Sequence, residues 1–191
     1  MSLNLNINYI VSGLERSGTS LMMQILHASG VPITYDEESR PADDNNPRGY
    51  FELEGGKIIS RLEDGTFPMS DYRGKFIKVT AYGLQFLPPG NYNIVYMLRD
   101  LDEILRSQAK MMGAQNTETY EKDRSLLVMV NERALSKIAE RQYPIIKINY
   151  GKLIDTPETE LEALNSYING AIDVKKSLKA IDKSLYRNRK V

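Results

Sequence analysis

Short apolar runs alternate along the chain with longer segments in which apolar residues recur every three or four positions. The short runs predict buried strands at Ile7–Val11, Lys75–Thr80, Asn93–Leu98 and Pro144–Asn149. The longer segments predict helices at Gly18–Ser29, in part of Phe51–Leu62, from Asp100 to about Lys110, at Thr117–Gln142 and at Thr156–Asn169. Strands separated by helices predict a parallel sheet of four to five strands with helices on both faces, which is a three-layer α/β fold.

Cap signals support two of these helices. Asp100 and Glu103 have the spacing of a capping pair at a helix start. Thr156 precedes Pro157, a favoured first helical residue, and Gly170 follows the same segment as a stop signal. Residues 34–47 are polar and predict a loop over the ligand-binding end of the sheet. Because no linker rich in Gly, Pro or Ser divides the chain, we expect residues 1–191 to form one domain.

Composition narrows the range of partners. The 191 residues include 25 basic and 25 acidic ones, so no overall charge favours nucleic acid or an anionic membrane surface. No cysteine is present, which removes disulfides, thiolate catalysis and cysteine metal ligands. No apolar run approaches the ~18 residues of a membrane span, and no signal-peptide pattern opens the chain, so we expect a cytoplasmic protein.

The first predicted strand runs directly into a candidate anion-binding loop. Gly13 and Gly18 bracket four residues, which is the spacing of a P-loop, and an apolar helix pattern follows at once. Backbone N–H groups in such a turn and at the helix start form an anion site. The nucleotide-hydrolysing version continues with Lys and Ser or Thr, but here Thr19 stands at the lysine position and Arg16 supplies the cation.

This loop resembles the phosphosulfate-binding loop of the sulfotransferases, whose pattern is Gly-x-Pro-Arg/Lys-Ser-Gly-Thr-Ser/Thr. Gly13 and the run from Arg16 to Ser20 fit the pattern, and Glu15 replaces its Pro. The resemblance implies a P-loop fold of this family and a single co-substrate, 3′-phosphoadenosine 5′-phosphosulfate.

A second motif resembles the same family. Arg99 ends the third predicted strand and Ser107 follows eight residues later, as do the family's Arg and Ser that bind the nucleotide 3′-phosphate. An Arg fork forms charge-assisted bonds to phosphate, and the Ser hydroxyl adds a donor. By this resemblance the co-substrate is bound by Gly13, Arg16, Ser17, Gly18, Thr19, Ser20, Arg99 and Ser107.

Weaker similarity extends along the chain. Residues 35–40 resemble the Glu-Glu-Thr-Arg segment of protein-tyrosine sulfotransferases, and residues 46–52 resemble a segment of bacterial members. Lys78 lies where the family often has a lysine ending a strand. The glycine-rich C-terminal nucleotide loop is absent, and Arg187, Arg189 and Lys190 either supply cations there or form a solvated basic tail.

The implied reaction is transfer of a sulfuryl group to a hydroxyl or amine. Charge develops on the bridging oxygen as the sulfuryl group leaves, and fixed cations and donors must stabilise it. Arg16 and Lys78 are the candidate catalytic cations, and the loop's N–H groups and hydroxyls are the donors. The loop lacks the Lys-Ser/Thr arrangement used with magnesium, and no His/Cys cluster is present, so we expect no metal.

The acceptor also needs a general base within hydrogen-bond reach. His27, the single histidine, lies more than two turns into the first predicted helix, so we interpret it as structural. The base is then a carboxylate. Glu38 is the first candidate, because it falls where the tyrosylprotein enzymes place their Glu; Glu52 is the alternative, and Glu37 stays open.

Two other function classes remain. A P-loop kinase or NTPase would need a Lys before the Ser/Thr and a magnesium-binding Asp at a strand end, and Thr19 and Arg99 occupy those positions. A non-catalytic nucleotide-binding module is the other alternative. For the enzyme we expect a small-molecule, carbohydrate or peptide acceptor and no nucleic acid or membrane span; the sequence selects neither the acceptor nor an oligomeric state.

Overall fold

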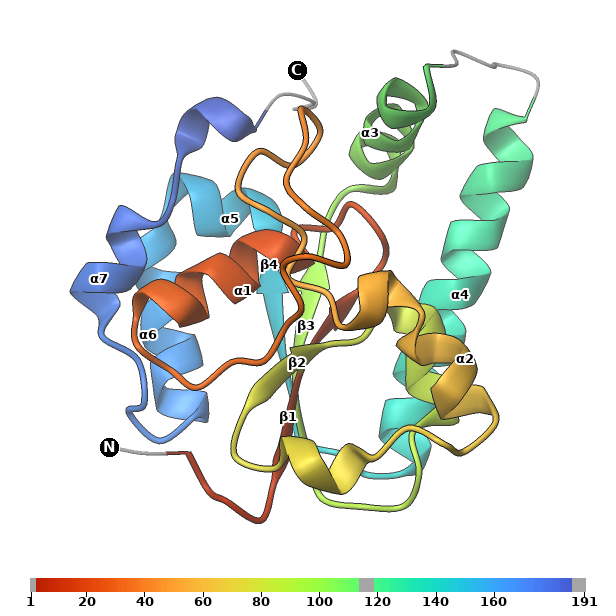
Figure 1. Ribbon diagram of the computed structural model, residues 1–191. Helices are drawn as coiled ribbons and strands as arrows, with labels where there is room; N and C mark the ends of the chain where they lie inside the picture. Colours follow the sequence, from red (N-terminus) through yellow and green to blue (C-terminus); the bar gives the residue numbers. More distant parts are fainter. Residues whose placement is uncertain (1–2, 114–118, 187–191) are drawn as a thin grey trace.

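The computed structural model describes residues 3–113 and 119–186 and contains a four-stranded sheet in that part of the chain. Its strands are β1 (Asn8–Gly13), β2 (Phe76–Lys78), β3 (Tyr92–Leu98) and β4 (Ile145–Asn149). They pair in parallel in the order β2-β1-β3-β4 (Figure 1). The α/β prediction and its four strands are therefore confirmed.

Alternate residues of each strand pack on opposite faces of the sheet, as the period of two requires. Tyr9 and Val11 of β1 contribute to one core cluster, whereas Ile10 between them contributes to the other. The first face is covered by α1 (Thr19–Ala28), α5 (Tyr150–Asp155), α6 (Pro157–Tyr167) and α7 (Val174–Lys179). The second face is covered by α2 (Ile58–Glu63), α3 (Leu101–Met112) and α4 (Tyr120–Glu140) (Figure 1). Short 3₁₀ turns lie at Glu54–Gly56, Met69–Tyr72, Ala81–Phe86 and Lys183–Leu185.

Two helices were not predicted. α5 and α7 are six residues each, too short to show a helical period in the sequence. The predicted cap at Asp100 is confirmed, since its side chain accepts from the N–H groups of residues 102 and 103. Thr156 is the N-cap residue of α6 as predicted, but its side chain forms no cap hydrogen bond, because its hydroxyl donates back to the Lys152 carbonyl in α5. The predicted start of the long helix at residue 117 lies outside the described residues.

The strand order creates one reversal point. The chain passes from β1 to β2 on one side, then crosses to β3 on the other side of β1. In parallel α/β sheets, ligands bind at such a point beyond the carboxyl ends of the strands. Here that place is the loop between β1 and α1. In the described ranges, no helix is long and apolar enough to cross a bilayer.

Candidate active site

The loop between β1 and α1 is held in a tight turn by its two glycines. Gly13 has φ 147°, and a Cβ there would lie 2.5 Å from Ser17 Oγ. Gly18 has φ 103°, and a Cβ there would lie 2.3 Å from the Tyr150 ring. Only glycine fits these backbone angles and close approaches. The turn leads into α1 at Thr19, and the first N–H groups of a helix have no intrahelical acceptor, so they are donors that an anion can use.

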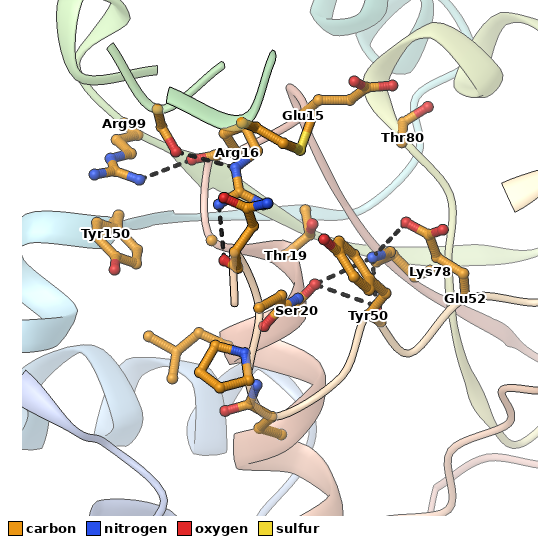
Figure 2. Close-up of a pocket in the computed structure, with 18 of the residues that line it drawn as sticks. Glu15, Arg16, Thr19, Ser20, Tyr50, Glu52, Lys78, Thr80, Arg99 and Tyr150 are labelled. Carbon is orange, nitrogen blue, oxygen red and sulfur yellow. Dashed lines mark hydrogen bonds and ion pairs between the residues drawn. The ribbon is translucent and has the colours of Figure 1, made fainter. Parts of the chain in front are cut away.

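A pocket opens beside this loop, and the ends of all four strands contribute to it (Figure 2). Arg99 and Tyr150, which follow β3 and β4, lie at one end of the pocket, which we call the arginine end. Lys78 at the end of β2 lies at the other, which we call the lysine end. Residues of the loop line the middle. The pocket lining includes Glu15, Arg16, Gly18, Thr19, Ser20, Arg40, Tyr50, Glu52, Lys78, Thr80, Arg99, Ser107 and Tyr150.

Arg16 joins the two sequence motifs. Its Nε donates to Ser107 Oγ at 3.0 Å, and one terminal nitrogen donates to the Asn45 carbonyl at 3.1 Å. Arg16 itself has φ 69°, a left-handed conformation that is uncommon outside glycine. The guanidinium is thus fixed against the lining of the pocket rather than extended into solvent.

Arg99 is held at the arginine end by several contacts. Its Nε donates to Glu103 Oε2 at 3.0 Å, and its Nη1 donates to the Arg16 carbonyl at 2.9 Å. The guanidinium carbon lies 4.4 Å from the centre of the Tyr150 ring, a cation–π distance. The Arg99 side chain is 7% exposed, and Nη2 has no hydrogen-bond partner among the described residues.

Lys78 is buried at the lysine end. Its Nζ lies 2.9 Å from Glu52 Oε1 and donates to Ser20 Oγ at 3.2 Å and to the Tyr50 carbonyl. Burial lowers the pKa of the Lys78 amine, and the attraction of Glu52 only partly opposes this. An ammonium has three N–H donors, so these acceptors account for all of them.

Glu52 lies between two cations. Its Oε1 faces Lys78 and its Oε2 accepts from Arg40 at 2.8 Å. Burial raises the pKa of the Glu52 carboxyl, but the combined attraction of Lys78 and Arg40 outweighs it and the pKa is lowered. Arg40 also lies 3.7 Å from the centre of the Tyr50 ring. The carboxylate is therefore ionised near neutral pH and fixed in the pocket.

The structure separates the other candidate bases from this pocket. Glu37 and Glu38 are exposed on the segment between α1 and α2 and are absent from the pocket lining. His27 is exposed in the last turn of α1, where its ring approaches Tyr35 at 5.9 Å and Phe51 at 6.2 Å. Among the three carboxylates that the sequence left open, only Glu52 lines the pocket.

The predicted nucleotide-binding residues also differ in whether they line the pocket. Arg16, Gly18, Thr19 and Ser20 line the pocket together with Arg99 and Ser107. Gly13 shapes the turn but is not in the lining, and Ser17 Oγ is buried with no hydrogen-bond partner in the described part of the chain. Arg187, Arg189 and Lys190 lie outside the described residues.

Sequence reasoning missed three residues of the pocket or its surroundings. Tyr150 follows β4 and packs on both Gly18 and Arg99. Tyr50 supplies a carbonyl to Lys78 and a ring to Arg40. Glu103 was assigned only to a helix cap, although a Glu four residues after an Arg is a recognisable ion-pair spacing. In the described residues, no group of three or more His, Cys, Asp or Glu side chains could hold a metal ion.

Fold and pocket together define a parallel α/β protein with a candidate anion-binding loop at the sheet reversal point. No protein-family model and no curated protein matches the sequence. Among solved structures, the chain is similar to the sulfotransferase domain of the olefin synthase from Synechococcus PCC 7002. That match has a TM-score of 0.58 and 13% identity and covers 99% of this chain and 90% of that one.

Two further structures are similar: mouse sulfotransferase SULT7A1 complexed with PAP, and retinol dehydratase in a complex with retinol and PAP. Their TM-scores are 0.52 and 0.51, at 14% and 15% identity. Each alignment covers 94% of this chain and 64% of the other protein, so the chain spans less than two thirds of their length. The chain has the sulfotransferase fold, as the sequence motifs predicted.

Proposed function

We propose that this protein is a sulfotransferase that moves a sulfuryl group from 3′-phosphoadenosine 5′-phosphosulfate to a hydroxyl or amine without a metal. The observation that carries the proposal is the hydrogen bond between Arg16 and Ser107, 91 residues apart, at 3.0 Å. It joins the phosphosulfate-type loop to the Arg99–Ser107 motif in one pocket. Either motif alone is compatible with other anions. Two such motifs in one pocket fit a ligand that carries two separate anionic groups.

The residues of the pocket fit this co-substrate. Gly18, Thr19 and Ser20 would bind the 5′-phosphosulfate through backbone N–H groups and hydroxyls, since they open α1 and line the pocket. Arg99 and Ser107 would bind the 3′-phosphate at the arginine end. Two of the similar structures carry PAP, which supports a nucleotide of this type for the present pocket.

The lysine end is the proposed site of transfer. Lys78 is a fixed cation beside Ser20 of the loop, and Arg16 is a second cation in the lining. Both would stabilise the charge that develops on the bridging oxygen when the sulfuryl group leaves. Because all three Lys78 donors already have acceptors, a ligand oxygen would have to replace one of them.

For the general base we propose Glu52. The resemblance to tyrosylprotein enzymes favours Glu38, but Glu52 is the alternative that lines the pocket and contacts Lys78. If Lys78 turned to the co-substrate, Glu52 would lose an opposite charge and its pKa would rise, which suits proton acceptance. Glu38→Gln and Glu52→Gln distinguish the two assignments.

The acceptor class is proposed as a small molecule, carbohydrate or peptide with a polar reacting end. Glu15, Thr80 and Glu52 surround the lysine end (Figure 2) and offer hydrogen-bond acceptors. An apolar acceptor would desolvate these groups without replacing their bonds to water, which is unfavourable. Hydroxyl and amine groups would satisfy them.

A thermal-shift comparison tests the nucleotide assignment, because a ligand that binds the folded state raises its melting temperature. We expect adenosine 3′,5′-bisphosphate to stabilise the protein in EDTA and to do so more than adenosine 5′-monophosphate. Stabilisation by ATP only with magnesium would overturn the proposal in favour of a P-loop kinase. Stabilisation by the bisphosphate without transfer to any acceptor would favour a binding module.

A further inference from the structure

The C-terminal segment reaches the arginine end of the pocket through Tyr186 and is held by side-chain contacts at two places. The Arg48 side chain donates to the Ala180 carbonyl at 2.7 Å and pairs with Asp182 at 3.0 Å. Farther along, the Tyr186 hydroxyl donates to the carboxylate of Glu103, 2.9 Å from each oxygen. Residues 180–186 are therefore fixed beside the site by contacts to a loop and to α3.

The second of these contacts continues to Arg99. The Glu103 side chain is 5% exposed and pairs through Oε2 with Arg99 Nε at 3.0 Å. The Arg99 guanidinium carbon lies 5.4 Å from the centre of the Tyr186 ring as well as 4.4 Å from that of Tyr150. The two rings meet edge to face, with centroids 5.0 Å apart. The guanidinium is thus held by a carboxylate at Nε, by a carbonyl at Nη1 and by two aromatic rings.

We propose that Glu103 and Tyr186 are positioning residues that orient Arg99 toward the nucleotide 3′-phosphate. The inference rests on the proposed function and adds the C-terminal segment to the nucleotide site. Tyr186 acts through Glu103: its hydroxyl fixes the carboxylate, the carboxylate fixes Nε, and Nη2 stays available for phosphate. The sequence has no glycine-rich C-terminal nucleotide loop, and the C-terminal segment contributes Tyr186 to this region.

Two physical reasons favour a positioning role over a purely structural ion pair. Each planar guanidinium has fixed donor directions, so fixing two of its nitrogens sets the direction of the third. A buried carboxylate beside a phosphate site also weakens the attraction for the anion, so its presence there has to be offset by another benefit. Glu103 partly neutralises Arg99, so its benefit to binding must come from orientation rather than charge.

The experiment is calorimetric binding of adenosine 3′,5′-bisphosphate and adenosine 5′-monophosphate to Tyr186→Phe. This change removes the hydroxyl and keeps the ring. We expect affinity for the bisphosphate to fall about tenfold, near the lower limit for a hydrogen bond to a charged group, with monophosphate affinity changed less than about twofold. The matched control is Tyr120→Phe, which removes a 2.7 Å bond from a tyrosine hydroxyl to Asp102, the neighbour of Glu103 on the same helix.

A double-mutant cycle shows whether Tyr186 acts through Glu103. In a Glu103→Ala background we expect Tyr186→Phe to have little further effect on bisphosphate binding. If Glu103→Ala does not fold, the single variants decide. Equal losses for both nucleotides, or no difference between Tyr186→Phe and Tyr120→Phe, would overturn the positioning role. Failure of the unaltered protein to bind the bisphosphate would instead overturn the proposed function.

Discussion

The two ends of the pocket each contain a buried cation paired with a glutamate, but the two pairs leave their cations in different states. At the arginine end, Arg99 and Glu103 are 7% and 5% exposed, and Nη2 has no partner among the described residues. At the lysine end, Lys78 and Glu52 are 4% and 11% exposed, and the ammonium has an acceptor for every N–H. Arg99 can donate to a ligand without losing a contact, whereas Lys78 must give up one of its present acceptors.

The difference follows from the chemistry of the two side chains. A guanidinium has five N–H donors in one plane, so it keeps donors for a ligand after two are used. An ammonium has three, and burial requires that all be satisfied. We infer that the arginine end suits steady binding of a phosphate, whereas the lysine end suits a group that changes contacts during the reaction.

The largest effect is expected at the lysine end. Glu52→Gln keeps the size of the side chain but removes its ability to accept a proton. If Glu52 is the base, kcat falls about 10²–10⁴-fold, the usual contribution of a positioned base. Steady-state kinetics measures this, with circular dichroism to check folding because Lys78 loses its charged partner.

Glu38→Gln is the matched control for that prediction. Glu38 is exposed and lies outside the pocket lining, so we expect this variant to keep most of its activity. Loss of activity in Glu38→Gln with retention in Glu52→Gln would exchange the two roles. Activity in both variants would mean that neither carboxylate accepts the proton.

A smaller effect is expected at the arginine end. Arg99→Ala removes the cation assigned to the 3′-phosphate, and losing a charge-assisted pair costs about 1.5–3 kcal/mol. Calorimetry should therefore show weaker binding of adenosine 3′,5′-bisphosphate and nearly unchanged binding of adenosine 5′-monophosphate. Because Arg99 also donates to the Arg16 carbonyl, equal losses for both nucleotides would indicate that it supports the loop instead.

The smallest effect concerns stability in acid. The pKa of Glu52 is lowered in the folded protein, mainly because attraction to Lys78 and Arg40 outweighs burial. A carboxyl with a lowered folded pKa contributes stability above its unfolded pKa, about 4.3, and loses it as the pH falls through the folded value. Denaturant unfolding between pH 6 and pH 3 should thus show a smaller acid loss for Glu52→Gln than for the unaltered protein. An equal loss would contradict the pairing.

The sequence predicted those parts of the site that depend on local patterns. The turn from Gly13 to Gly18 and the spacing from Arg99 to Ser107 are contiguous motifs, and the parallel sheet brings them together at its carboxyl end. Lys78 was found through its resemblance to the family's strand-terminal lysine; the predicted strand ran to Thr80, and in the structure β2 ends at Lys78. Their positions are set by backbone hydrogen bonding, which apolar runs and glycines encode directly.

The remaining parts depend on how irregular segments fold over the sheet. Glu38 and Glu52 lie on the same irregular segment between α1 and the 3₁₀ turn at Glu54–Gly56, and only the path of this segment decides which one is buried beside Lys78. Tyr186 meets Glu103 across 83 residues, with no regular period between them. Side-chain pairs between distant loops have no signature in a single sequence, because the loop ends are positioned by the whole fold.

The most direct test of the account is sulfuryl transfer itself. Protein treated with EDTA is incubated with 3′-phosphoadenosine 5′-phosphosulfate labelled in its sulfuryl group and with pooled hydroxyl and amine acceptors, and products are analysed by mass spectrometry. The account predicts a labelled sulfated product, formed without added metal and strongly reduced in Glu52→Gln. Transfer of a phosphoryl group from ATP that requires magnesium, with no sulfated product from any acceptor, would contradict it.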